Sequence, residues 1–230
     1  MASAFPERRA DGPLPFPDRT AAGLLLGDRL TGAYFAAVPG YPERAVVAAL
    51  PRGGVAVGRA VAACLGVPLE VLVTRKIGHP EEPELGLGAI AEGGEPVFDD
   101  EMLTRTGLHP SDLDGVVAAE RSELERRVLV YRGGRPPPDF AGRCVIVVDD
   151  GLATGVTARA ALRAVRARGA VSTVLAVPVA SAQGVDVLTA ETDEVVTLVT
   201  PRRFRSVGEW YAEFGQLTDS DVLTLLAAPR

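Results

Sequence analysis

Short apolar runs rich in Val and Ala alternate along this chain with longer segments whose apolar residues recur at helical spacing. The runs are short and uninterrupted, which is typical of parallel strands covered on both faces. They lie at residues 45–50, 69–74, 145–148, 173–177 and 194–199. Helical segments are expected at residues 18–35, 54–65, 111–131, 156–169 and 181–189. The alternation predicts an α/β fold with a mostly parallel central sheet flanked by helices.

The chain of 230 residues is predicted to form a single domain over residues 18–230, with its core at about residues 45–200. Residues 1–17 are polar and rich in proline, which predicts a loosely ordered segment. Residues 75–96 are rich in Glu, Pro and Gly and predict a long loop able to act as a lid, with short strands around residues 89–91 and 97–98. The tail, residues 201–230, gathers several aromatic residues and is expected to pack beside the sheet.

The segment from Arg143 to Gly169 carries the most chemical information. The predicted strand Val145–Val148 is followed by Asp149 and Asp150, then by a turn of small residues and a helix beginning near Val156. The start of that helix exposes backbone N–H groups that have no partner within the helix. These amides, at residues 153–157, form a ready site for a phosphate dianion.

The two acids next to this cradle indicate what else the ligand carries. Carboxylates repel phosphate, so Asp149 and Asp150 should bind a different part of the ligand. Sugar hydroxyls suit them, because an ionised Asp accepts strong hydrogen bonds from hydroxyl groups. A phosphate at one end and a vicinal diol at the other describe a ribose 5-phosphate. The alternatives are a purely structural turn and a Walker-B-like strand; the second lacks the companion motif GxxxxGK[ST], which does not occur in the chain.

The sequence VIVVDDGLATGVT resembles the motif with which type I phosphoribosyltransferases bind phosphoribosyl pyrophosphate (PRPP). The resemblance implies that Asp149 and Asp150 hold the ribose hydroxyls. It implies 5-phosphate contacts from the residues of the following turn, Ala153, Thr154, Gly155, Val156 and Thr157. Ala153 stands where 6-oxopurine members have an Asp, as in adenine-type members, which argues against hypoxanthine or guanine as the acceptor.

Two more motifs follow predicted strands, and the carboxyl ends of such strands form one edge of an α/β sheet. Arg52, Gly53 and Gly54 occupy the position of the family's pyrophosphate loop; alternatively they are a simple turn with a surface arginine. Arg75 and Lys76 would serve the same pyrophosphate, or form a solvated basic pair. Lys76 is the single lysine among 24 basic residues, which suggests that this position needs a compact, rotatable charge.

Composition restricts the classes of function. The net charge of −6 argues against a sequence-independent nucleic-acid binder. Cys64 and Cys144 lie in apolar settings, which disfavours a disulfide framework and favours a reducing cytoplasm. His79 and His109 are too few and too scattered for a metal cluster. With no signal-peptide core and no apolar run near the ~20 residues of a membrane span, we expect a cytoplasmic protein without a membrane partner.

The resemblance implies an enzyme that transfers the 5-phosphoribosyl group from PRPP to a nitrogenous base or amine and releases pyrophosphate. Its catalytic residues would be Asp149, Asp150, Lys76 and Arg52. The cofactor would be Mg²⁺, held by Asp149 and Asp150 through water, and the assembly a homodimer. Two alternatives remain: a regulatory protein of the same fold that senses PRPP or a nucleotide without turnover, and an unrelated phosphosugar hydrolase.

Overall fold

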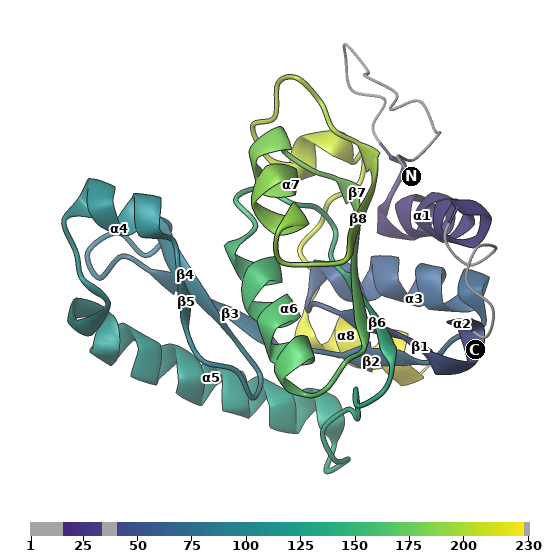
Figure 1. Ribbon diagram of the computed structural model, residues 1–230, viewed down its shortest axis with the longest axis horizontal. Coiled ribbons are helices and arrows are strands. Elements are labelled where there is room, and N and C mark those ends of the chain that lie inside the picture. The colour runs from purple at the N-terminus through teal and green to yellow at the C-terminus, as the bar shows by residue number, and fades with distance from the viewer. Residues whose placement is uncertain (1–15, 34–40, 228–230) are drawn as a thin grey trace.

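The computed structural model describes residues 16–33 and 41–227, and its centre is a parallel sheet of five strands (Figure 1). The strand order is β2-β1-β6-β7-β8, with all neighbouring pairs parallel. The strands are β1 (Ala45–Ala49), β2 (Leu69–Val71), β6 (Cys144–Val148), β7 (Ser172–Val179) and β8 (Glu194–Val199). The predicted α/β class and its mostly parallel sheet are therefore confirmed.

Helices cover both faces of this sheet, as its two-sided burial requires. Along β6, Val145 and Val147 pack into the cluster that contains α6 side chains, whereas Ile146 and Val148 pack toward α1 and α3. The covering helices are α1 (Arg19–Ala33) and α3 (Gly53–Leu65) on one face, and α6 (Val156–Ala167) and α7 (Ala182–Thr189) on the other. A short helix, α2 (Tyr41–Arg44), precedes β1.

A second, antiparallel sheet forms an arm that projects from the core (Figure 1). Its strands are β3 (Thr74–Gly78), β4 (Gly86–Ala91) and β5 (Val97–Phe98), and it packs with the helices α4 (Asp100–Thr106) and α5 (Asp114–Arg132). A 3₁₀ helix, η2 (Pro110–Leu113), leads into α5.

The arm corrects two predictions. The strand expected at residues 69–74 divides after β2, because Leu69–Val71 pair with β1 of the central sheet whereas Thr74 pairs with Ala91 of the arm. Residues 75–96 are not one continuous loop: residues 75–78 and 86–91 are strands of the antiparallel sheet, and the short strands expected around residues 89–91 and 97–98 are present as parts of β4 and β5. Gly88 permits the close pairing, since a Cβ there would lie 2.6 Å from the Val97 carbonyl oxygen. Whether the arm acts as a lid remains a prediction.

Helix boundaries were predicted with mixed success. Asp18 caps α1 as expected, accepting a 2.7 Å hydrogen bond from the Ala21 amide. The Ser111 cap is wrong: Ser111 lies inside the 3₁₀ helix Pro110–Leu113, which begins with a reciprocal pair of hydrogen bonds between His109 and Asp112, and α5 starts only after it. The helix α4, capped by Asp99, was not predicted.

The C-terminal tail folds back over the core with its helices η3 (Val207–Trp210) and α8 (Asp219–Ala227). Trp210 and Tyr211 are buried against Phe16 and Val179, and α8 packs on α3 and α5. The tail thus lies beside the central sheet. Most of the N-terminal segment predicted to be loose, and the expected end of the first helix at residues 34–35, lie outside the described residues.

Candidate active site

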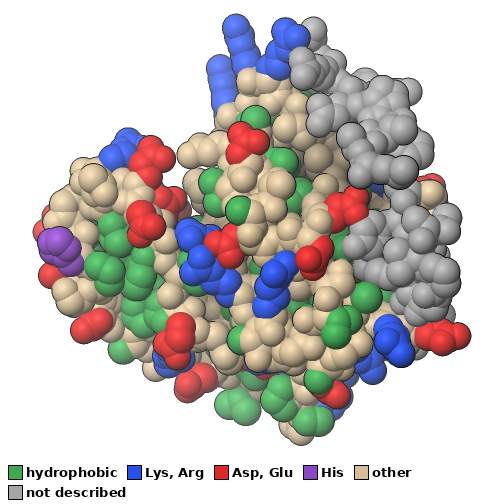
Figure 2. All heavy atoms as spheres, in the orientation of Figure 1, with side chains coloured by type: hydrophobic (Ala, Val, Ile, Leu, Met, Phe, Trp, Pro, Cys, Tyr) green, Lys and Arg blue, Asp and Glu red, His purple; other side chains and the backbone are tan. Residues whose placement is uncertain are grey.

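The carboxyl ends of the parallel strands open into a cleft of about 790 Å³ between the core and the arm. It is lined by residues of all three predicted motifs: Arg52, Gly53, Arg75, Lys76, Asp149, Asp150 and Thr157. Two of these motifs, the Arg52 loop and the twin acids, converge because β1 and β6 are parallel neighbours that end on the same edge. In Figure 2, acidic and basic side chains are intermingled over the visible face.

The twin acids are held in a fixed arrangement. The Asp149 carboxylate accepts a 2.8 Å hydrogen bond from the Asp150 amide. Asp150 pairs through one carboxylate oxygen with the Arg19 Nε at 2.8 Å, and its carbonyl accepts a hydrogen bond from the Tyr211 hydroxyl at 2.5 Å. Arg19 in turn stacks on the Phe214 ring at 3.9 Å. One face of the acid pair therefore remains for a ligand.

Burial dominates the electrostatics of the pair. Burial, followed by repulsion from Asp150, raises the pKa of Asp149 well above its ordinary value. Burial also raises the pKa of Asp150, and the hydrogen bond from Arg19 opposes that rise. Two ionised carboxylates at this place are costly without a partner, so a ligand that donates hydrogen bonds or brings a cation would relieve the cost.

Replacing Asp149 by asparagine is expected to raise the melting temperature of the ligand-free protein at pH 7 by about 2–4 °C, which corresponds to about 1 kcal/mol at this size. The raised pKa means that the native state holds protons that the unfolded state has lost, so stability falls as the pH rises above the unfolded-state pKa of about 4. Asparagine carries no charge and avoids that loss. Thermal unfolding of both proteins between pH 4 and pH 8 measures this; the gain should disappear near pH 4, and a variant less stable than wild type at pH 7 would contradict the burial argument.

The predicted phosphate cradle has the expected shape. Gly155 adopts a left-handed conformation, with a φ of 85°, immediately before α6 begins at Val156. Ala153 and Thr154 are exposed, while Thr157 lines the cleft itself. The Ser181 hydroxyl, at the start of α7, donates a 2.5 Å hydrogen bond to the Ala153 carbonyl and so supports the turn from behind.

The loop after β1 lies directly against the acids. A Cβ on Gly53 would overlap the Asp150 carboxylate, and one on Gly54 would lie 2.7 Å from the Val148 carbonyl oxygen and 2.9 Å from the Asp149 Cα. The peptide bond between Pro51 and Arg52 is cis. Glycine is needed at both positions because the two strand ends approach each other so closely.

Arg75 and Lys76 reach the cleft from a different element than the one predicted. They lie within β3 of the antiparallel sheet, not at the end of a parallel strand. Arg75 pairs with Glu120 of α5 at 2.6 Å, and Lys76 is exposed. The basic pair still lines the cleft, so its proposed contact with a pyrophosphate keeps its geometric basis.

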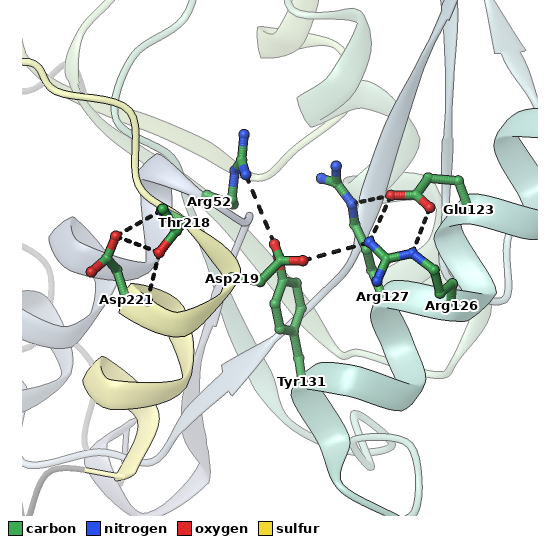
Figure 3. Close-up of polar contacts among 8 residues, drawn as sticks. All are labelled: Arg52, Glu123, Arg126, Arg127, Tyr131, Thr218, Asp219 and Asp221. Carbon is green, nitrogen blue, oxygen red and sulfur yellow. Dashed lines mark hydrogen bonds and ion pairs between the residues drawn. The ribbon is translucent and has the colours of Figure 1, made fainter.

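Sequence reasoning did not find three residues around the cleft. Arg19 lies beside Asp150. Figure 3 shows the other two, Arg127 on α5 and Asp219 beside Arg52. Their positions depend on how α1, α5 and the tail pack, which no local pattern reveals. The tail aromatics pack as expected: Trp210 and Tyr211 are 4% and 5% exposed.

Comparison with known proteins agrees with this geometry. Residues 40–208 match the family described as phosphoribosyl transferase domain, and the chain belongs to that family. A Mycobacterium tuberculosis (strain H37Rv) protein named provisionally as a phosphoribosyl transferase is 43% identical over 211 residues, which are 92% of this chain and 46% of the relative. The chain thus spans about half the length of the curated relatives it matches.

Solved structures share the same architecture. The crystal structure of TT1426 from Thermus thermophilus is 42% identical, with a TM-score of 0.75, and the match covers 93% of this chain and 98% of that one. AQ2163 from Aquifex aeolicus, at 13% identity and a TM-score of 0.50, covers 84% of this chain and 85% of its own; it shares the fold alone. None of the described helices combines the length and the hydrophobicity that a membrane crossing requires.

Proposed function

We propose that this protein transfers the 5-phosphoribosyl group from PRPP to a nitrogen nucleophile and releases pyrophosphate. One observation supports this most strongly: Asp149 and Asp150, the Arg52 loop and the start of α6 meet in a single cleft. The membership of the phosphoribosyl transferase family supports the same reaction class.

PRPP would occupy the cleft in one orientation. Its 5-phosphate would accept hydrogen bonds from the amides of residues 153–157, where the first turn of α6 leaves them without partners. The ribose diol would donate to Asp149 and Asp150. The pyrophosphate would lie by the loop of Arg52 and its two glycines, within reach of Lys76 from the arm.

The reaction breaks the bond between the anomeric carbon and the pyrophosphate oxygen and forms a bond from that carbon to the acceptor nitrogen, which gives up a proton. Positive charge develops on the ribose and negative charge on the leaving group. Asp149 and Asp150 would fix the sugar, and Arg52 and Lys76 would stabilise the leaving pyrophosphate. Positioning and fixed charges of this kind account for large rate enhancements without covalent help from the protein.

The donor groups present fit a magnesium ion that arrives with PRPP. No group of three or more His, Cys, Asp or Glu side chains suited to a metal occurs among residues 16–33 and 41–227. Mg²⁺ characteristically uses one or two carboxylates together with substrate phosphates and water. Asp149 and Asp150 would therefore hold it through water, and the bound ion would neutralise part of the pyrophosphate charge.

A panel of acceptors tests the proposal. Pyrophosphate release is measured with PRPP, Mg²⁺ and, one at a time, adenine, hypoxanthine, guanine, orotate, nicotinate and ammonia. Release that depends on one acceptor supports the transferase; adenine is favoured over 6-oxopurines because Ala153 offers no carboxylate for the base. PRPP binding without release for any acceptor would contradict the transferase and support the sensing role instead.

Replacing Lys76 by arginine is expected to lower kcat about tenfold, equivalent to about 1.4 kcal/mol of transition-state stabilisation. The exposed position should tolerate the larger side chain, so the melting temperature should stay within about 1 °C of wild type. Steady-state kinetics and thermal unfolding measure the two effects. An unchanged kcat would remove the argument that this position needs an ammonium group.

A further inference from the structure

One face of α5 forms a wall of the cleft. Gly115, Val116, Ala119, Glu120 and Arg127 all line it. Residues four apart lie on the same side of a helix, and the small residues early in α5 leave space in front of this wall. Arg127 comes from the turn of α5 that faces the pyrophosphate loop (Figure 3).

The Arg127 side chain is held by its Nε alone. That atom donates a 2.8 Å hydrogen bond to Glu123, whose carboxylate also accepts two hydrogen bonds from Arg126, at 2.7 and 2.9 Å. These bonds lower the pKa of Glu123 to about 2, so it stays ionised above that pH. In Figure 3 the two Nη atoms of Arg127 point away from Glu123, and none of the described residues accepts a hydrogen bond from them.

Arg52 is paired more loosely, through an Nη atom, with a carboxylate at the start of α8. Its Nη1 lies 3.9 Å from the Asp219 carboxylate at the start of α8. Asp219 also accepts a 2.6 Å hydrogen bond from the Tyr131 hydroxyl, and this bond is the main reason that its pKa is lowered. Arg126 lies 3.5 Å from Asp219 and so joins the two carboxylates into one network.

We infer that Arg127 is a second guanidinium for the leaving pyrophosphate, facing Arg52, and that Glu123 and Asp219 are positioning residues for this pair. The inference rests on the proposed function. A guanidinium held by its Nε presents both Nη groups together, which is the geometry that binds two oxygens of a phosphate. The ribose hydroxyls would bind to Asp149 and Asp150. The Glu120 carboxylate is already paired with Arg75. The two arginines would thus bind the leaving group from opposite sides.

Direct binding of two probes tests the inference without knowledge of the acceptor. Isothermal titration gives the Kd of magnesium pyrophosphate and of ribose 5-phosphate for wild type, Arg127→Ala and Arg127→Lys. The alanine variant should bind pyrophosphate at least about tenfold more weakly, since it loses charge-assisted hydrogen bonds to the leaving group. The lysine variant should recover only part of the loss. Ribose 5-phosphate should bind all three proteins equally.

Arg121→Ala is the matched control on the same helix. Arg121 is 42% exposed and lies 3.8 Å from Glu95, away from the network of Arg127, so both Kd values should match wild type. A pyrophosphate Kd for Arg127→Ala within about twofold of wild type, with ribose 5-phosphate bound normally, overturns the inference and leaves the proposed function standing. If wild type binds neither probe, the proposed function fails and the inference fails with it.

A double-mutant cycle tests the positioning role of Asp219. Asp219→Asn should weaken pyrophosphate binding about threefold to tenfold when Arg52 is present and less than about twofold in the Arg52→Ala background, because Asp219 acts mainly through Arg52 and reaches Arg127 only through Arg126 and Glu123. A purely structural role would give the same loss in both backgrounds. That result would overturn the positioning assignment.

Discussion

Asparagine in place of Asp150 is expected to weaken PRPP binding about 10²- to 10³-fold and to reduce turnover at least as much. The variant loses the charge that, in the proposed function, would accept hydrogen bonds from the ribose diol, and each charge-assisted bond of this kind contributes about 1.5–3 kcal/mol. It also leaves the Arg19 guanidinium, whose side chain is 11% exposed, without its ion-pair partner. Isothermal titration with PRPP and Mg²⁺ measures the loss directly.

The control for this substitution is Asp186→Asn. Asp186 lies on the exposed face of α7, outside the cleft, and the same loss of one charge there should leave PRPP affinity unchanged. Titrations are run well below the melting temperature of each variant, so that loss of folding does not imitate loss of binding. Wild-type affinity in the Asp150 variant would show that the ribose does not bind at this acid.

Alanine at Gly54 is expected to destabilise the protein by about 1–3 kcal/mol and to lower turnover about 100-fold. The added Cβ would meet the backbone of Val148 and Asp149, at 2.7 and 2.9 Å, and neither neighbour is a flexible side chain that can move aside. The start of α3 must therefore shift away from β6. That shift would separate the pyrophosphate loop from the acids by a fraction of an ångström or more.

Gly32→Ala provides the comparison. No atom lies within 4 Å of the Cβ that it would carry in the last turn of α1, so alanine should be neutral or stabilising by up to about 1 kcal/mol. At about 2–4 °C per kcal/mol, the Gly54 variant should melt about 2–12 °C below wild type. A Gly54→Ala protein with wild-type melting temperature and turnover would contradict the close approach of the two strand ends.

The central sheet could be predicted because its strands are buried on both faces and therefore appear as unbroken apolar runs. The arm could be predicted only in part, as short strands around residues 89–91 and 97–98. The strand Thr74–Gly78 carries two adjacent charged residues and the strand Gly86–Ala91 carries two glycines, so neither shows the alternation of a half-buried strand and the residues between 75 and 96 looked mainly like a loop. What makes them strands is pairing with each other and packing against α5, which are tertiary effects that override local propensity.

The residues of the site divide in the same way, into those that a sequence pattern reveals and those that depend on tertiary packing. Asp149, Asp150, Arg52 and Thr157 could be brought together from sequence because parallel strands end at one edge. Arg19 and Asp219 could not, since they reach the cleft from elements far away in sequence. Arg127 offered a weak signal, its position four residues after Glu123 on a predicted helix, but that spacing equally describes an ordinary surface ion pair.

A crystal structure of the protein with PRPP and Mg²⁺ tests the central claim most directly. The account predicts the 5-phosphate on the amides of residues 153–157, the ribose hydroxyls within hydrogen-bond distance of Asp149 and Asp150, and the pyrophosphate between the Arg52 loop and α5. Density for PRPP elsewhere, or a cleft that stays empty at saturating ligand, would contradict it.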